Sequence, residues 1–216
     1  KIIKKNLAKI NQKTITIFPI STSVIRSLPF KVIFELIQYF KNEYRVKVII
    51  DDSTISKTLE KQNIKKYNFE FIKPKNIEEL TMEISKTSFG IFVDSGPLHL
   101  AKILDKRGLL IETSVKNDIL LNNSNKIFAL KNTYFSNYCS GPCGLVDIFS
   151  NNNNVGCYET NKTSFEEVRK IENLKKLQRF NKSENNTHFS LNPVGCVKNI
   201  AVNNIIELIK VKIKEE

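Results

Sequence analysis

The sequence has 216 residues, with 34 Lys and Arg against 22 Asp and Glu, which gives a formal net charge of +12. This length suits one large domain or two small ones, and the apolar residues recur in periodic runs, so the composition excludes intrinsic disorder as the main state. No stretch approaches the ~20 consecutive apolar residues of a membrane span, and the first residues lack the apolar core of a secretory signal. We therefore expect a soluble, cytoplasmic protein.

The excess of positive charge leaves several classes of partner open. No basic stripe interleaves with aromatic residues as in a nucleic-acid groove, so a nucleic-acid partner is not expected. Attraction to phosphorylated ligands and peripheral association with an anionic membrane, at its inner face, remain as functional alternatives. A solvated surface in a chain rich in Lys, Asn and Ile explains the charge equally, and we favour it.

Strand-like and helix-like segments alternate along the first half of the sequence. Residues 14–19 alternate small polar and apolar side chains before a proline, which predicts a strand, and Pro29 begins a run of helical periodicity. Asn76, with Glu79 three residues later, is a typical start of a helix. The predicted strands are 14–19, 46–50, 69–72, 89–93 and 108–113. The predicted helices are 29–41, 53–62, one that begins at Asn76, and 98–104.

This alternation predicts an α/β fold: a Rossmann-like parallel sheet with helices on both faces, which binds its ligands at the carboxyl ends of the strands. We assign residues 1–118 to this core. Residues 119–198 read as an irregular appendage rich in Cys and Asn, interrupted by a basic helical stretch at 164–180. Residues 199–216 return to helical periodicity and predict a C-terminal helix over 199–213.

The most informative residues follow the nearly all-apolar strand at 89–93. This strand delivers Asp94, Ser95 and Gly96 to the edge of the sheet, and the amide groups of the next helix's first turn, with its dipole, favour an anion such as a diphosphate. Ser95 can donate to a phosphate oxygen, and Asp94 can hold the loop or accept from a sugar hydroxyl. A plain helix cap is the alternative role. His99, one turn further, is more often a packed side chain than a catalyst.

The stretch from Asp94 to Ala101, Asp-Ser-Gly-Pro-Leu-His-Leu-Ala, resembles the signature of the heptosyltransferase family, glycosyltransferase family 9, in its C-terminal, nucleotide-sugar-binding domain. The resemblance covers about residues 14–114. It implies the C-terminal half of a GT-B architecture, in which two Rossmann-like domains bind donor and acceptor. In the earlier loop, Arg26 matches the position of the family's basic, phosphate-contacting residue. The residues that the resemblance assigns to the donor and its diphosphate are Ser21, Thr22, Arg26, Asp94, Ser95, Gly96 and His99.

The resemblance implies an inverting glycosyltransferase that requires no cofactor. It moves a heptose-like sugar from a nucleotide diphosphate, preferably an ADP-sugar, to a lipopolysaccharide or related glycan or glycolipid acceptor. The family's catalytic carboxylate lies in an N-terminal acceptor domain that we expect outside this sequence, so no residue here is assigned as the base. Where the family has a glycine-containing turn, this chain has Asp51-Asp52-Ser53. We hypothesise, by position alone, that Ser53 faces the nucleoside.

Two other classes of function remain. The acidic replacements leave open a non-catalytic nucleotide or nucleotide-sugar binding module. A basic interaction domain for nucleic acid or a membrane is the other class, but it does not explain the stretch from Asp94 to Ala101.

The four cysteines follow the spacing Cys-x3-Cys-x13-Cys-x38-Cys. A zinc site needs four converging sulfurs, and the first pair is one residue wider than the common Cys-x2-Cys knuckle. Because no signal segment is visible, reduced thiols or a metal are favoured over disulfides. Ordinary buried cysteines are the favoured interpretation, with zinc as the alternative. These residues are Cys139, Cys143, Cys157 and Cys196.

Overall fold

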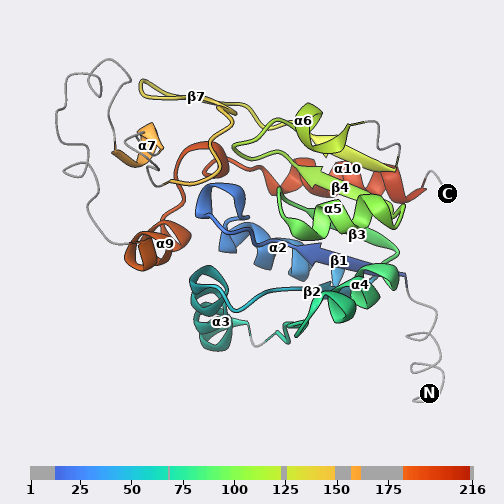
Figure 1. Ribbon diagram of the computed structural model, residues 1–216. Coiled ribbons are helices and arrows are strands. Elements are labelled where there is room, and N and C mark those ends of the chain that lie inside the picture. Colours follow the sequence, from blue (N-terminus) through green and yellow to red (C-terminus); the bar gives the residue numbers. More distant parts are fainter. Residues whose placement is uncertain (1–12, 68, 123–125, 149–156, 162–181, 215–216) are drawn as a thin grey trace.

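The structure is a computed structural model that describes residues 13–67, 69–122, 126–148, 157–161 and 182–214. Its centre is a sheet of five parallel strands in the order β2-β1-β3-β4-β5 (Figure 1). The predicted α/β class is thus confirmed. The strands are β1 (Thr14–Phe18), β2 (Arg45–Val48), β3 (Phe89–Phe92), β4 (Gly108–Ile111) and β5 (Ile127–Leu130).

Helices cover both faces of this sheet, because side chains of successive strand residues point to opposite sides. Ile17 of β1 packs in the core shared with α2 and α10, whereas Phe18 packs on the other face and stacks on Phe92, with ring centroids 5.0 Å apart. The first face is covered by α2 (Phe30–Phe40) and α10 (Val202–Lys214), and α3 (Thr54–Lys66) adds to its core. The second face is covered by α4 (Ile77–Ser85), α5 (Gly96–Ile103) and α6 (Asn117–Leu121).

Local sequence signals set several of these helix boundaries. The side chain of Asn76 caps α4 by accepting from the N–H of Glu79 at 2.9 Å, as its spacing predicts. Pro29 precedes the first residue of α2, where its missing N–H costs nothing. The predicted C-terminal helix is confirmed as α10.

The predicted strand at 69–72 is wrong. Only Ile72 pairs there, in an isolated parallel bridge with Ile49 beyond the end of β2. The backbone of Phe69 is instead hydrogen-bonded by the side chain of Asn63, which accepts from its N–H at 3.0 Å and donates to its carbonyl oxygen. Because a side chain already satisfies these groups, they do not form a strand ladder.

The segment 119–198 contains several short elements that the sequence did not predict, and one of them belongs to the central sheet. Strand β5 pairs along β4 and extends the sheet. The rest of this segment, as far as it is described, consists of the strand pair β6 (Tyr134–Phe135) and β7 (Ser140–Gly141), short helices and turns. The predicted basic helical stretch at 164–180 lies outside the described residues. The described elements of the segment's second half are α7 (Tyr158–Asn161), α9 (Lys182–Leu191) and the 3-10 turn η3 (Gly195–Val197).

The chain reverses direction across the sheet next to β1. β2, the next strand after β1, pairs on one side of it, and β3 pairs on the other. In open parallel sheets such a switch point leaves a crevice at the carboxyl ends of the two central strands, where ligands bind. Residues after Phe18 and after Phe92 therefore face a common site. Among the described residues, no helix is long and apolar enough to cross a bilayer.

Candidate functional site

The loop after β1 folds back on itself at this switch point. The N–H of Leu28 donates to the carbonyl oxygen of Pro19 at 2.8 Å and joins the two ends of the loop. In its middle, the Ser27 hydroxyl donates to the carbonyl oxygen of Ser23 at 2.9 Å and accepts from the N–H of Ser21 at 2.9 Å. These bonds are buried, so they give the loop one shape. The loop also contains the 3-10 turn η1 (Val24–Arg26).

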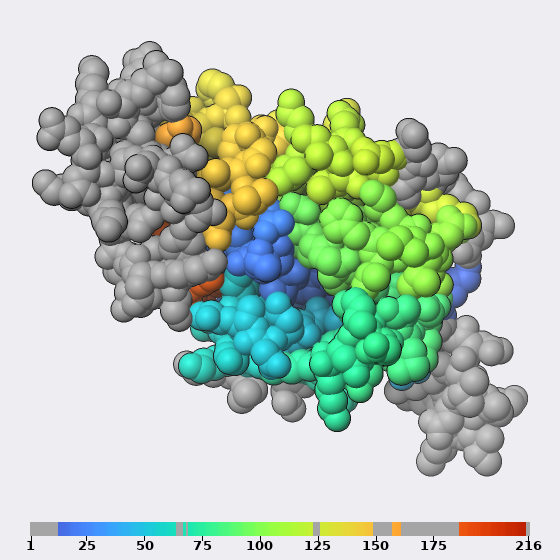
Figure 2. Space-filling model, viewed as in Figure 1, coloured from blue at the N-terminus to red at the C-terminus, as the bar shows by residue number. Residues whose placement is uncertain are grey.

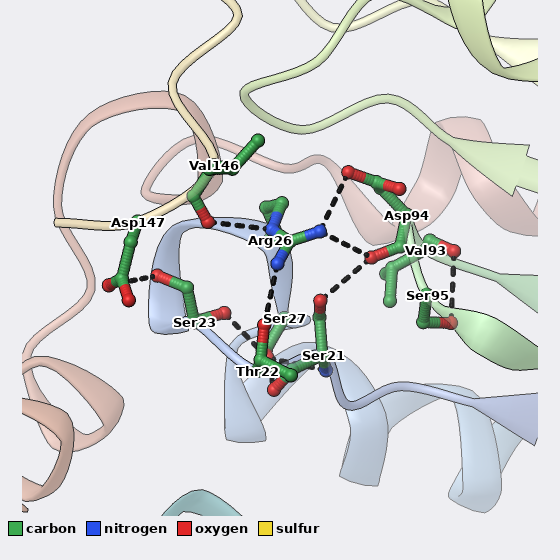
Figure 3. Close-up of polar contacts among 10 residues, drawn as sticks. All are labelled: Ser21, Thr22, Ser23, Arg26, Ser27, Val93, Asp94, Ser95, Val146 and Asp147. Atoms are coloured by element: carbon green, nitrogen blue, oxygen red, sulfur yellow. Dashed lines mark hydrogen bonds and ion pairs between the residues drawn. The ribbon is translucent and has the colours of Figure 1, made fainter. Parts of the chain in front are cut away.

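Three segments of the chain hold the Arg26 guanidinium (Figure 3). Its Nη1 donates to Oδ2 of Asp94 at 3.0 Å, its Nη2 to the hydroxyl of Thr22 at 2.6 Å, and its Nε to the carbonyl oxygen of Val146 at 2.8 Å. The Ser21 hydroxyl donates to the backbone carbonyl oxygen of Asp94 at 2.7 Å. Four residues that the sequence analysis named, Ser21, Thr22, Arg26 and Asp94, are thus in one hydrogen-bonded group.

The turn from β3 into α5 presents an open helix N-terminus. Ser95 precedes α5 with extended backbone, and its hydroxyl donates to the carbonyl oxygen of Val93 at 3.2 Å instead of capping the helix. A Cβ added at the exposed Gly96 would meet no atom within 4 Å. Pro97 has no N–H, and the N–H of Leu98 donates to the carbonyl oxygen of Ser95 at 3.1 Å, so within the first turn the N–H of Gly96 remains, with the helix dipole, to favour an anion. His99 is exposed one turn along α5.

An apolar cavity of about 290 Å³ adjoins this helix N-terminus. In Figure 2 the surface is hollowed between α5 and the two helices α3 and α4. Its volume is just below the ~300–1,000 Å³ typical of ligand pockets. The cavity contains one carboxylate and one ammonium group, those of Asp51 and Lys75. The other lining residues are Phe18, Ile20, Ile49, Ile50, Pro74, Asn76, Ile77, Leu80 and Pro97.

Ser53, the residue expected on the nucleoside side, does not line this cavity. It begins α3, where its hydroxyl donates to Oδ1 of Asp51 at 2.6 Å and accepts from the N–H of Ser56 at 3.3 Å. Asp51, which the sequence analysis treated only as a departure from the family, is the carboxylate at the cavity. Ser53 is thus hydrogen-bonded to a residue that lines the cavity, and its own contact with a nucleoside stays a prediction.

Buried hydroxyl groups follow β4, the neighbour of β3. Within the described part of the chain, the hydroxyls of Thr113 and Ser114 are buried and have no hydrogen-bond partner. Such groups are uncommon, because an unsatisfied buried hydroxyl costs about 1–3 kcal/mol. Neither residue belongs to a motif that predicts a role from the sequence.

The four cysteines lie in the appendage as thiols, without disulfides. Burial raises the pKa of Cys139 to about 11 and that of Cys196 to about 12, and it also raises the pKa of Cys157. Repulsion between the cysteine thiolates adds to each of these shifts. Among the described residues, however, no three His, Cys, Asp or Glu side chains are arranged to hold a metal ion. The zinc hypothesis gains no geometric support from the side chains as they stand.

The sequence matches no family model, and no curated protein matches it. Among solved structures, the chain is similar to E. coli heptosyltransferase WaaC with ADP, with a TM-score of 0.49 and 14% identity over 56% of this chain and 38% of that chain. It is also similar to E. coli ADP-heptose lps heptosyltransferase II, with a TM-score of 0.46 and 12% identity over 62% and 43% of the two chains.

A third similar structure is the dodecameric iron-containing heptosyltransferase TibC in complex with ADP-D-beta-D-heptose. Its TM-score is 0.47, with 13% identity over 95% of this chain and 46% of that chain. The chain thus spans less than half the length of each of these three proteins. At such identities the likeness is one of fold.

Proposed function

We propose that this chain is the nucleotide-sugar-binding domain of a glycosyltransferase, with the donor diphosphate between Arg26 and the N-terminus of α5. The observation that carries the proposal is the meeting, at the switch point of a parallel sheet, of a fixed guanidinium, an open helix N-terminus and an apolar cavity. The likeness of the stretch from Asp94 to Ala101 to the heptosyltransferase signature supports the same assignment.

The guanidinium of Arg26 retains a donor for a phosphate oxygen. Arginine has five N–H donors. The three hydrogen bonds described above and a longer one from Nη1 to the carbonyl oxygen of Asp94, at 3.5 Å, use four of them. The fifth, on Nη2, remains for a phosphate oxygen. Together with the N–H of Gly96, and with the hydroxyl of Ser95 once it exchanges its bond to the carbonyl of Val93 for one to the ligand, it can stabilise the charge that develops on a departing diphosphate.

The cavity suits the nucleoside of the same donor. Its walls are mainly apolar, as a base requires, and it adjoins α5 at Pro97. Oδ1 of Asp51 accepts from the hydroxyls of Ser53 and Ser56 at 2.6 and 2.5 Å, which fixes the carboxylate while Oδ2 can accept from a ribose hydroxyl.

The finer assignments rest on the family resemblance alone. We propose that the sugar is heptose-like, that the donor is an ADP-sugar, and that transfer inverts the anomeric carbon without a required cofactor. The acceptor is a lipopolysaccharide or related glycan at the cytoplasmic face of a membrane. The general base and the acceptor site belong to an N-terminal domain outside this sequence.

Calorimetric titration of this chain with ADP tests the donor site. ADP is the chosen probe because the WaaC and TibC structures contain ADP and ADP-heptose. Arg26→Ala should weaken binding by about tenfold or more, since a charge-assisted hydrogen bond to phosphate is lost. Arg45→Ala, which removes an exposed arginine at the opposite edge of the sheet, is the matched control. Equal affinity of parent and Arg26→Ala would contradict the assignment.

A non-catalytic nucleotide-sugar binding module is the second candidate function. It is favoured by the ion pair of Arg26 with Asp94, which already compensates the charge that would otherwise stabilise a leaving group. A protein that contains both domains distinguishes the two functions. Binding of ADP-heptose without sugar transfer to any acceptor supports the module, and transfer supports the enzyme.

A further inference from the structure

The segment after the cysteine pair lies directly against the loop that carries Arg26. Oδ1 of Asp147 accepts from the Ser23 hydroxyl at 3.0 Å, and the carbonyl oxygen of the preceding residue, Val146, accepts from Nε of Arg26 at 2.8 Å (Figure 3). These contacts join residues more than 100 positions apart in the sequence. The appendage thus supplies two acceptors to the loop at the switch point.

The segment itself is anchored at both ends. The N–H of Gly144 donates to the carbonyl oxygen of Ser114, after β4, at 2.8 Å. At the other end, the side chain of Ile148 is buried in the same core as the loop residues Val24 and Ile25, and its N–H donates to Oδ1 of Asp147 at 2.7 Å. The carboxylate of Asp147 therefore has a fixed position from which it holds the loop.

Ser23 is the residue through which this carboxylate acts. It is fully buried, at 0% exposure, and its carbonyl oxygen also accepts from the hydroxyl of Ser27. Loss of the Asp147 acceptor would leave the Ser23 hydroxyl buried without its partner, which favours a rearranged loop. Such a rearrangement would also move Arg26 away from the carbonyl of Val146, because both contacts come from adjacent residues of one segment.

We propose that Asp147 is a positioning residue for the diphosphate site: through Ser23 it fixes the loop, and with the carbonyl of Val146 it sets the orientation of the Arg26 guanidinium. The cysteine-bearing appendage is then part of the donor site. The identity of the ligand, a diphosphate, rests on the proposed function. The fixing of the loop by Asp147 is a property of the ligand-free protein.

The test uses Asp147→Ala, Asp147→Asn and the control Asp118→Asn, which changes an exposed aspartate on α6. Amide hydrogen exchange of the ligand-free chain should increase in residues 21–27 of Asp147→Ala and stay at the parent level in the control. Affinity for ADP and for pyrophosphate should fall by about tenfold, while affinity for adenosine is unchanged. Asp147→Asn keeps an oxygen acceptor and should restore most of both losses.

Ser23→Ala provides the second route if Asp147→Ala does not fold. It removes the donor of the same bond, and it should raise loop exchange and weaken pyrophosphate binding in the same way. Unchanged loop exchange in the folded variants overturns the inference, whatever the ligands do. An equal loss of adenosine and ADP affinity also overturns it, because the damage would not be specific to the phosphate side. Increased loop exchange in a chain whose parent binds no nucleotide supports the positioning role and refutes the proposed function.

Discussion

Replacement of Asp94 by asparagine is expected to destabilise the fold and to strengthen the binding of a diphosphate. The side chains of Asp94 and Arg26 are only 9% and 16% exposed, and Oδ2 lies 3.0 Å from Nη1. At this distance the Coulomb attraction is about 5.5 kcal/mol for an effective dielectric constant of ~20. Most of it is offset by desolvation of the two charges. We therefore expect the substitution to lower the free energy of unfolding by about 2 kcal/mol, the usual contribution of a hydrogen bond to a charged group.

The same substitution removes a negative charge next to the proposed anion site. The guanidinium of Arg26 then keeps its position through Thr22 and Val146 but has no carboxylate to compensate its charge. Pyrophosphate should therefore bind roughly tenfold more tightly, a gain of about 1.4 kcal/mol. Stability and anion affinity change in opposite directions, which a general loss of structure would not produce.

Urea denaturation at pH 7 and calorimetric titration with pyrophosphate measure the two effects. Glu60→Gln is the control, because this substitution also removes a carboxylate that forms an ion pair, here with Lys73 at 2.7 Å. That pair is about a third exposed, at 31% and 36%, so its loss should cost less than about 0.5 kcal/mol. A parent-like denaturation midpoint for Asp94→Asn, or weaker pyrophosphate binding, would refute the reasoning.

Three further predictions concern other parts of the fold. Glu83→Gln should cost about 1 kcal/mol at pH 7, because the hydrogen bond from Lys47 lowers the pKa of Glu83 from its ordinary 4.5. This contribution is present above pH 4.5 and is lost as the pH falls through the lowered pKa, so a difference that persists at pH 2 in urea denaturation contradicts it. In a thiol-reagent time course at pH 8, the exposed Cys143 should react well before Cys196. The pKa of Cys196, about 12, leaves only ~1 in 10,000 of its thiols as thiolate at this pH. Equal protection of all four thiols would contradict this order and would point to a bound metal. Gly108→Ala should cost about 2 kcal/mol in urea denaturation, because its Cβ would lie 2.4 Å from a backbone oxygen of β3, and a parent-like midpoint would refute this clash.

The elements that could be predicted are those whose signals are local. The cap at Asn76, the proline before α2 and the apolar periodicity of α10 each act within a few residues, and each is found where the sequence places it. The strand predicted at 69–72 failed because one side chain, that of Asn63, takes the backbone groups that a ladder would need. Strand β5 was missed because its four apolar residues stand alone in an Asn-rich region.

The contacts of the candidate site also include some that could be predicted from the sequence and some that could not. Parallel topology alone brings the loop after β1 to the end of β3, so the proximity of Arg26 and Asp94 could be anticipated from the order of the strands. The contacts of Val146 and Asp147 could not, because their segment has no periodicity and reaches the loop from more than 100 residues away. The place of Asp51 at the cavity was not predicted for a different reason. In the sequence, Asp51 stands where the resembled family has a glycine-containing turn, and this difference alone does not indicate a ligand contact.

The charge around the site argues for recognition by directed hydrogen bonds. The chain carries a formal +12, yet among the described residues the guanidinium at the switch point, that of Arg26, is paired with the carboxylate of Asp94, and the carboxylate of Asp147 contacts the same loop at Ser23. A site built to attract polyanions by net charge would gather cations there without such acids. Here an anion gains most from the N–H of Gly96 and the remaining N–H of Arg26, which point in fixed directions. A compact diphosphate can use both donors at once, whereas a diffuse polyanion cannot.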